Sequence, residues 1–145
     1  KPLRCAVYPP VVVLFRHAAA RYAQDGHTQR VQLQGRVENL AGIIQHDDRK
    51  PLAHWLAAQA RYMRLEAEKL AGASIEQLGW ADRLRRLILL APPAMFLYCF
   101  IVRGGVLDGK AGLYYALQRT VAEAILSLYL LERTLMPGGE PESRG

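Results

Sequence analysis

The feature that most constrains the fold of this chain is a run of sixteen residues, 87–102, without a single charged side chain. Leucine is the commonest residue in the run, and Pro92 and Pro93 interrupt it. A helix needs about 20 apolar residues to cross a bilayer, so this run is short for a span. It must be buried in the protein, lie in a membrane interface or, as a third possibility, span the membrane.

A second apolar segment follows, and its pattern is helical. Its apolar residues recur at spacings of three and four, which predicts a helix over about 109–136. Asp108 is suited to be its N-cap, and the prolines and glycines after Met136 predict its end. The residues that form the apolar stripe are Leu113, Leu117, Val121, Ala124, Leu128, Leu131 and Leu135. A chain of this size is too small to bury two such helices, so we expect a membrane-associated hairpin over 73–136, with a buried hairpin as the alternative.

Residues 51–86 combine helical spacing with many charges. Pro51 and Gly72 predict the two ends of one amphipathic helix. Ser74-Ile75-Glu76-Gln77 fits a capping box, so a second helix is expected to begin near Ile75. Four arginines flank the apolar run and are expected to contact lipid headgroups: Arg83, Arg85, Arg86 and Arg103.

Residues 1–50 predict short strands and turns. The β-branched run 11–15 is typical of a buried strand, and 30–33 and 37–44 predict two more, with a turn at Asp25-Gly26. Three short strands bury little surface alone, so we expect them to join a larger sheet. Because the chain opens with Lys-Pro-Leu rather than Met, and an apolar stretch follows at once, we expect the N-terminal part of the protein to be missing. The expected class is α+β, mainly α.

The charge and the cysteines limit the partners. The net charge of +6 suits an anionic membrane or a phosphate-bearing substrate as well as nucleic acid. No RNA-binding motif or basic-aromatic repeat is present, so no nucleic-acid partner is expected. Cys5 and Cys99 form neither a metal-binding pattern nor a disulfide framework, which predicts reduced thiols.

Four segments, taken in order, resemble the family 2 glycosyltransferases of the lipopolysaccharide-core type. Residues 8–16 resemble a strand of that family, and 25–31 fall at its acceptor-side loop. Residues 44–62 resemble its His-to-Arg-Tyr junction, and 100–113 its C-terminal Gly-Gly and Asp-Gly segment. The resemblance covers most of residues 8–135 and rests on the order and spacing of these segments together.

The resemblance implies a GT-A fold and inverting transfer of a sugar from a nucleotide-sugar donor to an acceptor hydroxyl. It implies a divalent metal, Mg or Mn, held by an Asp-x-Asp motif, and a carboxylate base. This sequence contains no Asp-x-Asp. The donor half and its metal are therefore expected upstream, with no metal bound by this chain and no turnover by it alone. On this basis residues 1–50 would be the end of the GT-A domain, 51–72 a junction helix and 137–145 a disordered tail.

The same resemblance indicates which residues would serve the site. Relatives often carry an acid where this chain has Gln29, and a neutral amide cannot accept a proton, so the candidate bases are Asp25, Asp47 and Asp48. The candidate substrate-binding residues are His27, Gln29, His46, Arg49, Gln59 and Arg61. The alternative is that 46–48 form a polar turn before the helix at Pro51 and that the others are surface residues. A metal site at His27 and 46–48 has suitable ligand types, but the spacing fits no known cage.

Together these patterns predict an enzyme on the cytoplasmic face of the bacterial inner membrane, with a cell-envelope glycan or a lipid-linked sugar as acceptor. The alternative is a non-enzymatic, membrane-associated helical interaction module.

Overall fold

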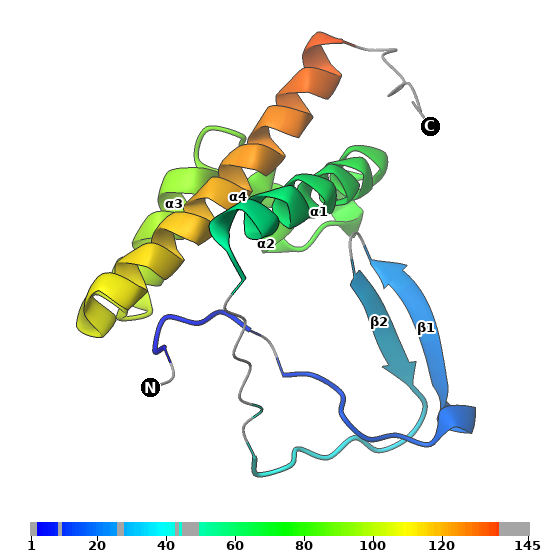
Figure 1. The fold of residues 1–145 in the computed structure, drawn as a ribbon. Coiled ribbons are helices and arrows are strands. Elements are labelled where there is room, and N and C mark those ends of the chain that lie inside the picture. Colours follow the sequence, from blue (N-terminus) through cyan, green and yellow to red (C-terminus); the bar gives the residue numbers. More distant parts are fainter. Residues whose placement is uncertain (1–2, 9, 26–27, 43, 45–49, 137–145) are drawn as a thin grey trace.

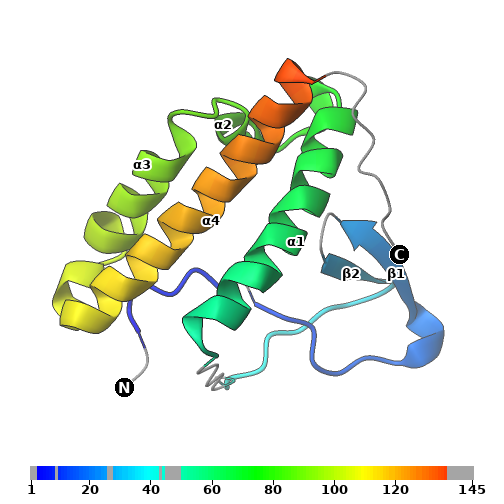
Figure 2. The same cartoon turned by 45° about the horizontal axis from the view of Figure 1, so that its top comes forward.

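The computed structural model describes residues 3–8, 10–25, 28–42, 44 and 50–136 (Figure 1). This part of the chain is mainly helical, with four α-helices and one two-stranded antiparallel sheet. The elements are β1 (Ala20–Asp25), β2 (Thr28–Leu33), α1 (Leu52–Gly72), α2 (Trp80–Arg85), α3 (Ala91–Leu97) and α4 (Gly109–Leu135). The longest helix, α4, lies between α3 and α1, as Figure 2 shows. The described residues give no evidence of the expected GT-A domain.

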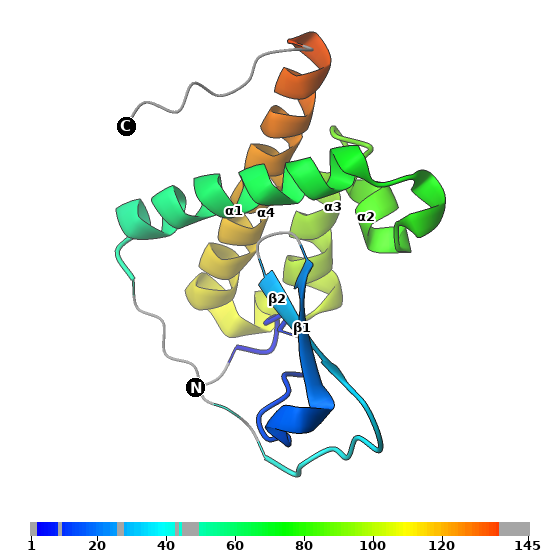
Figure 3. The same cartoon turned by 90° about the vertical axis from the view of Figure 1, so that its right-hand side faces the viewer.

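The helix predicted from Pro51 to Gly72 is confirmed. It forms α1 with Pro51 at the N-cap position. The buried side chains of α1 all come from its C-terminal half and pack against Ala122, Leu126 and Leu130 of α4. The N-terminal half of α1 extends past this contact (Figure 3), so apolar residues there, such as Leu52, stay exposed.

The second predicted helix is divided into two pieces. The capping box is present, with the Ser74 amide donating to Gln77 Oε1 at 3.1 Å, but it caps a single 3-10 turn, Ile75–Gln77. The α-helix α2 begins later, at Trp80, and has only six residues. The local capping signal was therefore detected correctly, while the length of the helix behind it was overestimated.

The two adjacent prolines start a helix instead of breaking one. Pro92 and Pro93 lie in the first turn of α3, where backbone N–H groups have no partner within the helix. A π-helical turn, Tyr98–Val102, continues α3, and Gly104 ends it in a left-handed conformation with φ +74°. The apolar run 87–102 is therefore divided among several short elements. Among the described residues, no helix combines the length and the apolarity that crossing a bilayer requires.

The predicted helix over 109–136 is confirmed as α4, with Asp108 at its N-cap position. Its start packs tightly against the preceding 3-10 turn, Gly105–Asp108. A Cβ on Gly112 would lie 2.0 Å from the carbonyl oxygen of Gly105, so only glycine fits at this approach.

The strand predictions were correct in one place out of three. Residues 30–33 belong to β2, which pairs with β1 from Ala20↔Leu33 to Asp25↔Thr28. The predicted strand at 11–15 is wrong, and the one at 37–44 is wrong for its described residues, because neither has a strand partner in the described chain. Apart from the half-buried Phe15, their large apolar side chains are exposed. The predicted turn at Asp25-Gly26 falls between β1 and β2, but Gly26 lies outside the described residues.

Candidate functional site

A buried cluster of charges connects three helices. Arg85, at the end of α2, donates from Nη2 to Glu123 Oε1 of α4 at 2.8 Å and from Nε to Glu123 Oε2 at 3.1 Å. Its Nη1 lies 3.3 Å from Glu66 Oε1 of α1 and 3.5 Å from Asp82 Oδ1. The two glutamate side chains are only 1% and 7% exposed. Burial lowers the pKa of Arg85, but these carboxylates outweigh it and hold the pKa above its usual value.

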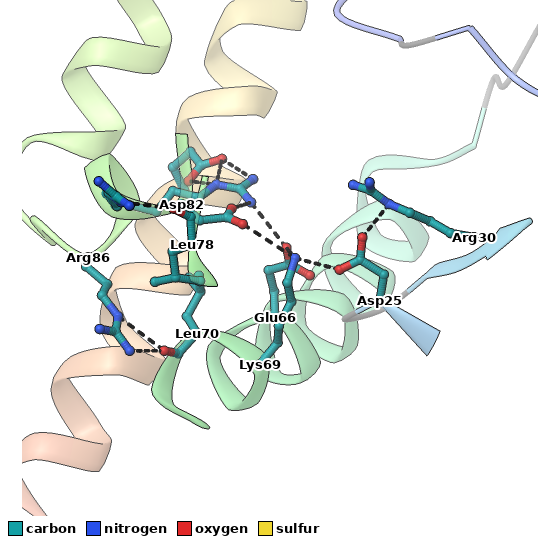
Figure 4. A network of polar contacts seen from close by, with 11 residues as sticks. Asp25, Arg30, Glu66, Lys69, Leu70, Leu78, Asp82 and Arg86 are labelled. Atoms are coloured by element: carbon teal, nitrogen blue, oxygen red, sulfur yellow. Dashed lines mark hydrogen bonds and ion pairs between the residues drawn. The ribbon is translucent and has the colours of Figure 1, made fainter. Parts of the chain in front are cut away.

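Lys69 of α1 joins the hairpin formed by β1 and β2 to this charge cluster. Its Nζ lies 2.7 Å from Asp25 Oδ1, at the end of β1, and within 3.6 Å of Glu66 and Asp82 (Figure 4). Arg30 of β2 pairs with the same Asp25 carboxylate. Burial lowers the pKa of Lys69, but the surrounding carboxylates raise it by more, so its net pKa lies above the usual value. Asp25, a predicted catalytic base, is thus engaged by two cations, of which Arg30 lies within the hairpin and Lys69 fastens the hairpin to α1.

Three of the four arginines predicted to contact lipid bind backbone carbonyls: Arg83 and Arg86 bind carbonyls near α1 and α2, and Arg103 binds one in the N-terminal segment. Arg83 Nε donates to the Leu78 carbonyl at 2.9 Å. Arg86 donates to the Leu70 carbonyl at 3.1 Å and to the Ala73 carbonyl at 2.6 Å, so it caps the C-terminal end of α1. Together with Arg85, these side chains hold the helices together; their contact with lipid stays a prediction.

The N-terminal segment is fastened to the start of α4. The Asp108 carboxylate accepts from the Arg4 amide at 2.7 Å and the Cys5 amide at 3.3 Å, in place of capping its own helix. The Tyr115 hydroxyl accepts from the backbone amide of Val7 at 3.0 Å, and Arg103 donates to a carbonyl of the same segment. Burial raises the pKa of Tyr115, while the hydrogen bond from Val7 lowers it by less.

More than half of the predicted catalytic and substrate-binding residues are not among those that the structure describes. His27, His46, Asp47, Asp48 and Arg49 lie outside the described residues.

The remaining predicted substrate-binding residues lie on two elements. Gln29 is exposed on β2 and pairs with Gln24 of β1, while Gln59 is half-buried and Arg61 exposed on α1. In the described part of the chain, no group of three or more histidine, cysteine or acidic residues could hold a metal.

The charge cluster was not anticipated from the sequence, although a signal for it exists. Glu66 lies between Met63 and Leu70 on the face of α1 that packs against the core, and Glu123 lies next to Ala122 on the buried face of α4. A carboxylate at the centre of an apolar helix face needs a buried cation. That rule predicts a cationic partner for each of the two glutamates, but it does not indicate that Arg85 pairs with both of them.

The connection between α3 and α4 exposes apolar side chains at one end of the molecule. We call this the apolar tip. It consists of Leu97, Ile101, Val102, Val106 and Leu107, which are between 52% and 72% exposed. Three exposed cations lie in the segments packed at this end, at Arg4, Arg103 and Lys110. The nearby carboxylate of Asp108 is occupied by backbone amides.

Comparison with known protein families, curated proteins and solved structures finds no match to this chain.

Proposed function

We propose that this chain is the membrane-docking, acceptor-side C-terminal part of a family 2 glycosyltransferase. The whole enzyme moves a sugar from a nucleotide-sugar donor to a cell-envelope glycan or lipid-linked acceptor at the cytoplasmic face of the bacterial inner membrane. The ordered resemblance of residues 8–16, 25–31, 44–62 and 100–113 supports this assignment. A donor-side Mg or Mn would be held by an Asp-x-Asp that this sequence lacks.

The observation that carries the docking part of the proposal is the apolar tip. Helix connections are normally polar because they face water, yet this one exposes five apolar side chains. Exposed cations lie beside it, at Arg4 and Arg103. An apolar surface flanked by basic side chains is the arrangement by which monotopic proteins enter the headgroup region of anionic membranes.

The apolar tip lies after the C-terminal end of α3, whereas three of the four arginines expected to contact lipid precede its N-terminal end. The Arg85 guanidinium is paired with buried carboxylates, so it has little freedom to reach a headgroup. The apolar tip lies at the opposite end of α3 from α2 in Figure 2. Of the four arginines expected at lipid, Arg103 is the one that belongs to this end.

The N-terminal segments support the enzyme part of the proposal. The apolar residues of the two extended stretches around the hairpin are exposed, among them Val11, Leu14, Val37 and Leu40. Apolar side chains in extended segments beside a two-stranded hairpin are suited to pack against a larger sheet. The ion pair between Asp25 and Lys69 would then fix the β1–β2 hairpin relative to the helices, which is a positioning role.

The enzyme assignment is tested by the upstream coding sequence and then by activity. We expect a nucleotide-binding βαβ region with an Asp-x-Asp, and metal-dependent hydrolysis of a nucleotide sugar by the full-length product that ends when the Asp-x-Asp is changed to Asn-x-Asn. A start codon close upstream of Lys1 without such a region would refute the glycosyltransferase assignment. In that case the non-enzymatic helical module becomes the better proposal.

The docking assignment is tested by flotation with liposomes of phosphatidylglycerol and of phosphatidylcholine. We expect the chain to float with the anionic liposomes at low salt, and Val102→Ser/Leu107→Ser to reduce the bound fraction at least fivefold. Trp80→Ser is the matched control, because Trp80 is 80% exposed on α2, away from the tip. Equal flotation of both variants would exclude the tip as the contact.

A further inference from the structure

One face of α4 is left largely exposed by the described part of the chain. Its apolar side chains follow one another along the helix; Leu131 is half-buried, and the other large ones are between 38% and 75% exposed. We call this set the α4 stripe; it consists of Tyr114, Leu117, Val121, Ala124, Leu128, Leu131 and Leu135.

The opposite face of α4 forms the core of the molecule. Tyr115, Ala116, Ala122, Leu126 and Leu130 are buried there against α1, α3 and the N-terminal segment. Figure 2 shows α4 between α3 and α1. The α4 stripe is therefore not needed to hold the monomer together, and its composition calls for another explanation.

The spacing of the α4 stripe is that of a coiled coil. The intervals from Tyr114 to Leu135 are 3, 4, 3, 4, 3 and 4 residues, which is a heptad repeat with apolar residues at every a and d position. A strict repeat of this kind is the narrow seam that a single partner helix fills, whereas a helix facing a broad core carries a wider apolar face. Three heptads extend over about 30 Å of helix.

We propose that the α4 stripe pairs with the α4 stripe of a second copy of this chain, in antiparallel orientation. The exposed charges beside the α4 stripe specify the direction, whereas the exposed Arg133 lies at heptad position f, away from the seam. Lys110 lies at the N-terminal end and Glu132 at the C-terminal end, and both are exposed. An antiparallel pair brings Lys110 of each copy to the end that carries Glu132 of the other. A parallel pair would place like charges together.

The antiparallel pairing has a defined register. In antiparallel coiled coils an a residue faces a d residue, so Leu117 faces Leu128 of the second copy and Val121 faces Ala124 of the second copy. The small Ala124 allows the helices to approach closely at the centre of the pair. The exposed area of the α4 stripe is on the order of 600 Å² per copy, which is the lower end of the roughly 600–1,000 Å² per partner that specific interfaces bury.

The first experiment measures the mass of the chain by sedimentation velocity or light scattering between about 1 and 100 μM. We expect a species of twice the 16.2 kDa of one chain. Leu117→Ser/Leu128→Ser removes four leucines from the pair and should raise the dimer dissociation constant by more than about 100-fold. Leu89→Ser/Leu90→Ser, which changes two exposed leucines outside the α4 stripe, should leave the dimer unchanged.

The second experiment tests the orientation by charge exchange. Lys110→Glu should weaken the dimer several-fold, and Lys110→Glu/Glu132→Lys should restore it, because the opposite charges meet again only in an antiparallel pair. These residues are exposed, so the helical circular dichroism of each variant should match that of the wild type.

Three results would overturn the proposal. The first is a wild-type chain that is monomeric at 100 μM. The second is a dimer that is unaffected by the leucine pair, and the third is a double charge variant weaker than the single one. A monomer whose flotation with liposomes depends on Leu117 and Leu128 would identify the membrane as the occupant of the α4 stripe instead.

Discussion

The buried cluster around Arg85 makes a quantitative prediction. Replacing Arg85 with alanine leaves Glu123, whose side chain is 1% exposed, without its bidentate partner and with the more distant Arg119 guanidinium, 3.9 Å away, beside it. It also removes one of the cations next to Glu66. Breaking a buried pair costs about 3–5 kcal/mol, and we expect the lower end of this range because Arg119 still offsets part of the buried charge. For a domain of this size that corresponds to a fall in the unfolding midpoint of about 10 °C or more.

The matched control is an arginine in a pair of the same chemistry at the surface. Arg64 Nη1 lies 3.1 Å from Glu68 Oε1 one helical turn away, and both side chains are more than a third exposed. Arg64→Ala should cost less than about 1 kcal/mol, since solvent screens the pair. Thermal and urea unfolding followed by circular dichroism compare the two variants.

A further variant separates the loss of a favourable pair from the cost of an unpaired charge. Arg85→Met/Glu123→Leu removes both charges and fills the site with apolar side chains, so it should be clearly more stable than Arg85→Ala. The reasoning is refuted if Arg85→Ala costs no more than Arg64→Ala, or if the double variant is the least stable of the three.

Three other predictions follow from local chemistry. The pKa of Lys69 is raised above its ordinary value of 10.5, so its ion pairs contribute their full stability below pH 10.5 and lose it as the pH rises through the raised pKa. Lys69→Met should therefore lose less stability than the wild type when urea unfolding is measured at increasingly alkaline pH. Burial raises the pKa of Cys5 and Cys99, so both thiols should react with iodoacetamide at pH 7.5 at least tenfold more slowly in the native chain than in urea. Gly112→Ala should cost more than about 2 kcal/mol because its Cβ meets backbone, whereas Gly72→Ala, with open space around it, should stay within about 1 kcal/mol of the wild type in urea unfolding.

The parts of the fold that the sequence predicted correctly depend on local signals. Pro51 and Gly72 mark the ends of α1 through backbone chemistry within a few residues, and the proline and glycines that follow Met136 in the sequence predict the end of α4. The ion pair between Arg64 and Glu68 needs only the helix that carries it. Such features are encoded in short windows, so a single sequence is enough to find them.

The parts that the sequence did not predict depend on distant partners. Residues 11–15 have the composition of a buried strand, but a strand needs a neighbour to pair with, and none is present in the described chain. The same holds for the candidate site. Asp25 was selected as a base for its chemistry, whereas its contact with Lys69, 44 positions away, gives it a structural partner.

The apolar tip and the α4 stripe constrain each other. In an antiparallel pair the two tips lie at opposite ends of the dimer. Both tips can contact the same flat bilayer only if the paired helices lie along the membrane surface, with the two-fold axis of the dimer perpendicular to the bilayer. Two linked contacts then bind more tightly than one. Leu117→Ser/Leu128→Ser, which keeps the tip, should therefore float with anionic liposomes but require several-fold more lipid than the wild type. If its lipid requirement is unchanged while its dimer is lost, the pair does not present both tips to the same membrane, and the two surfaces act independently.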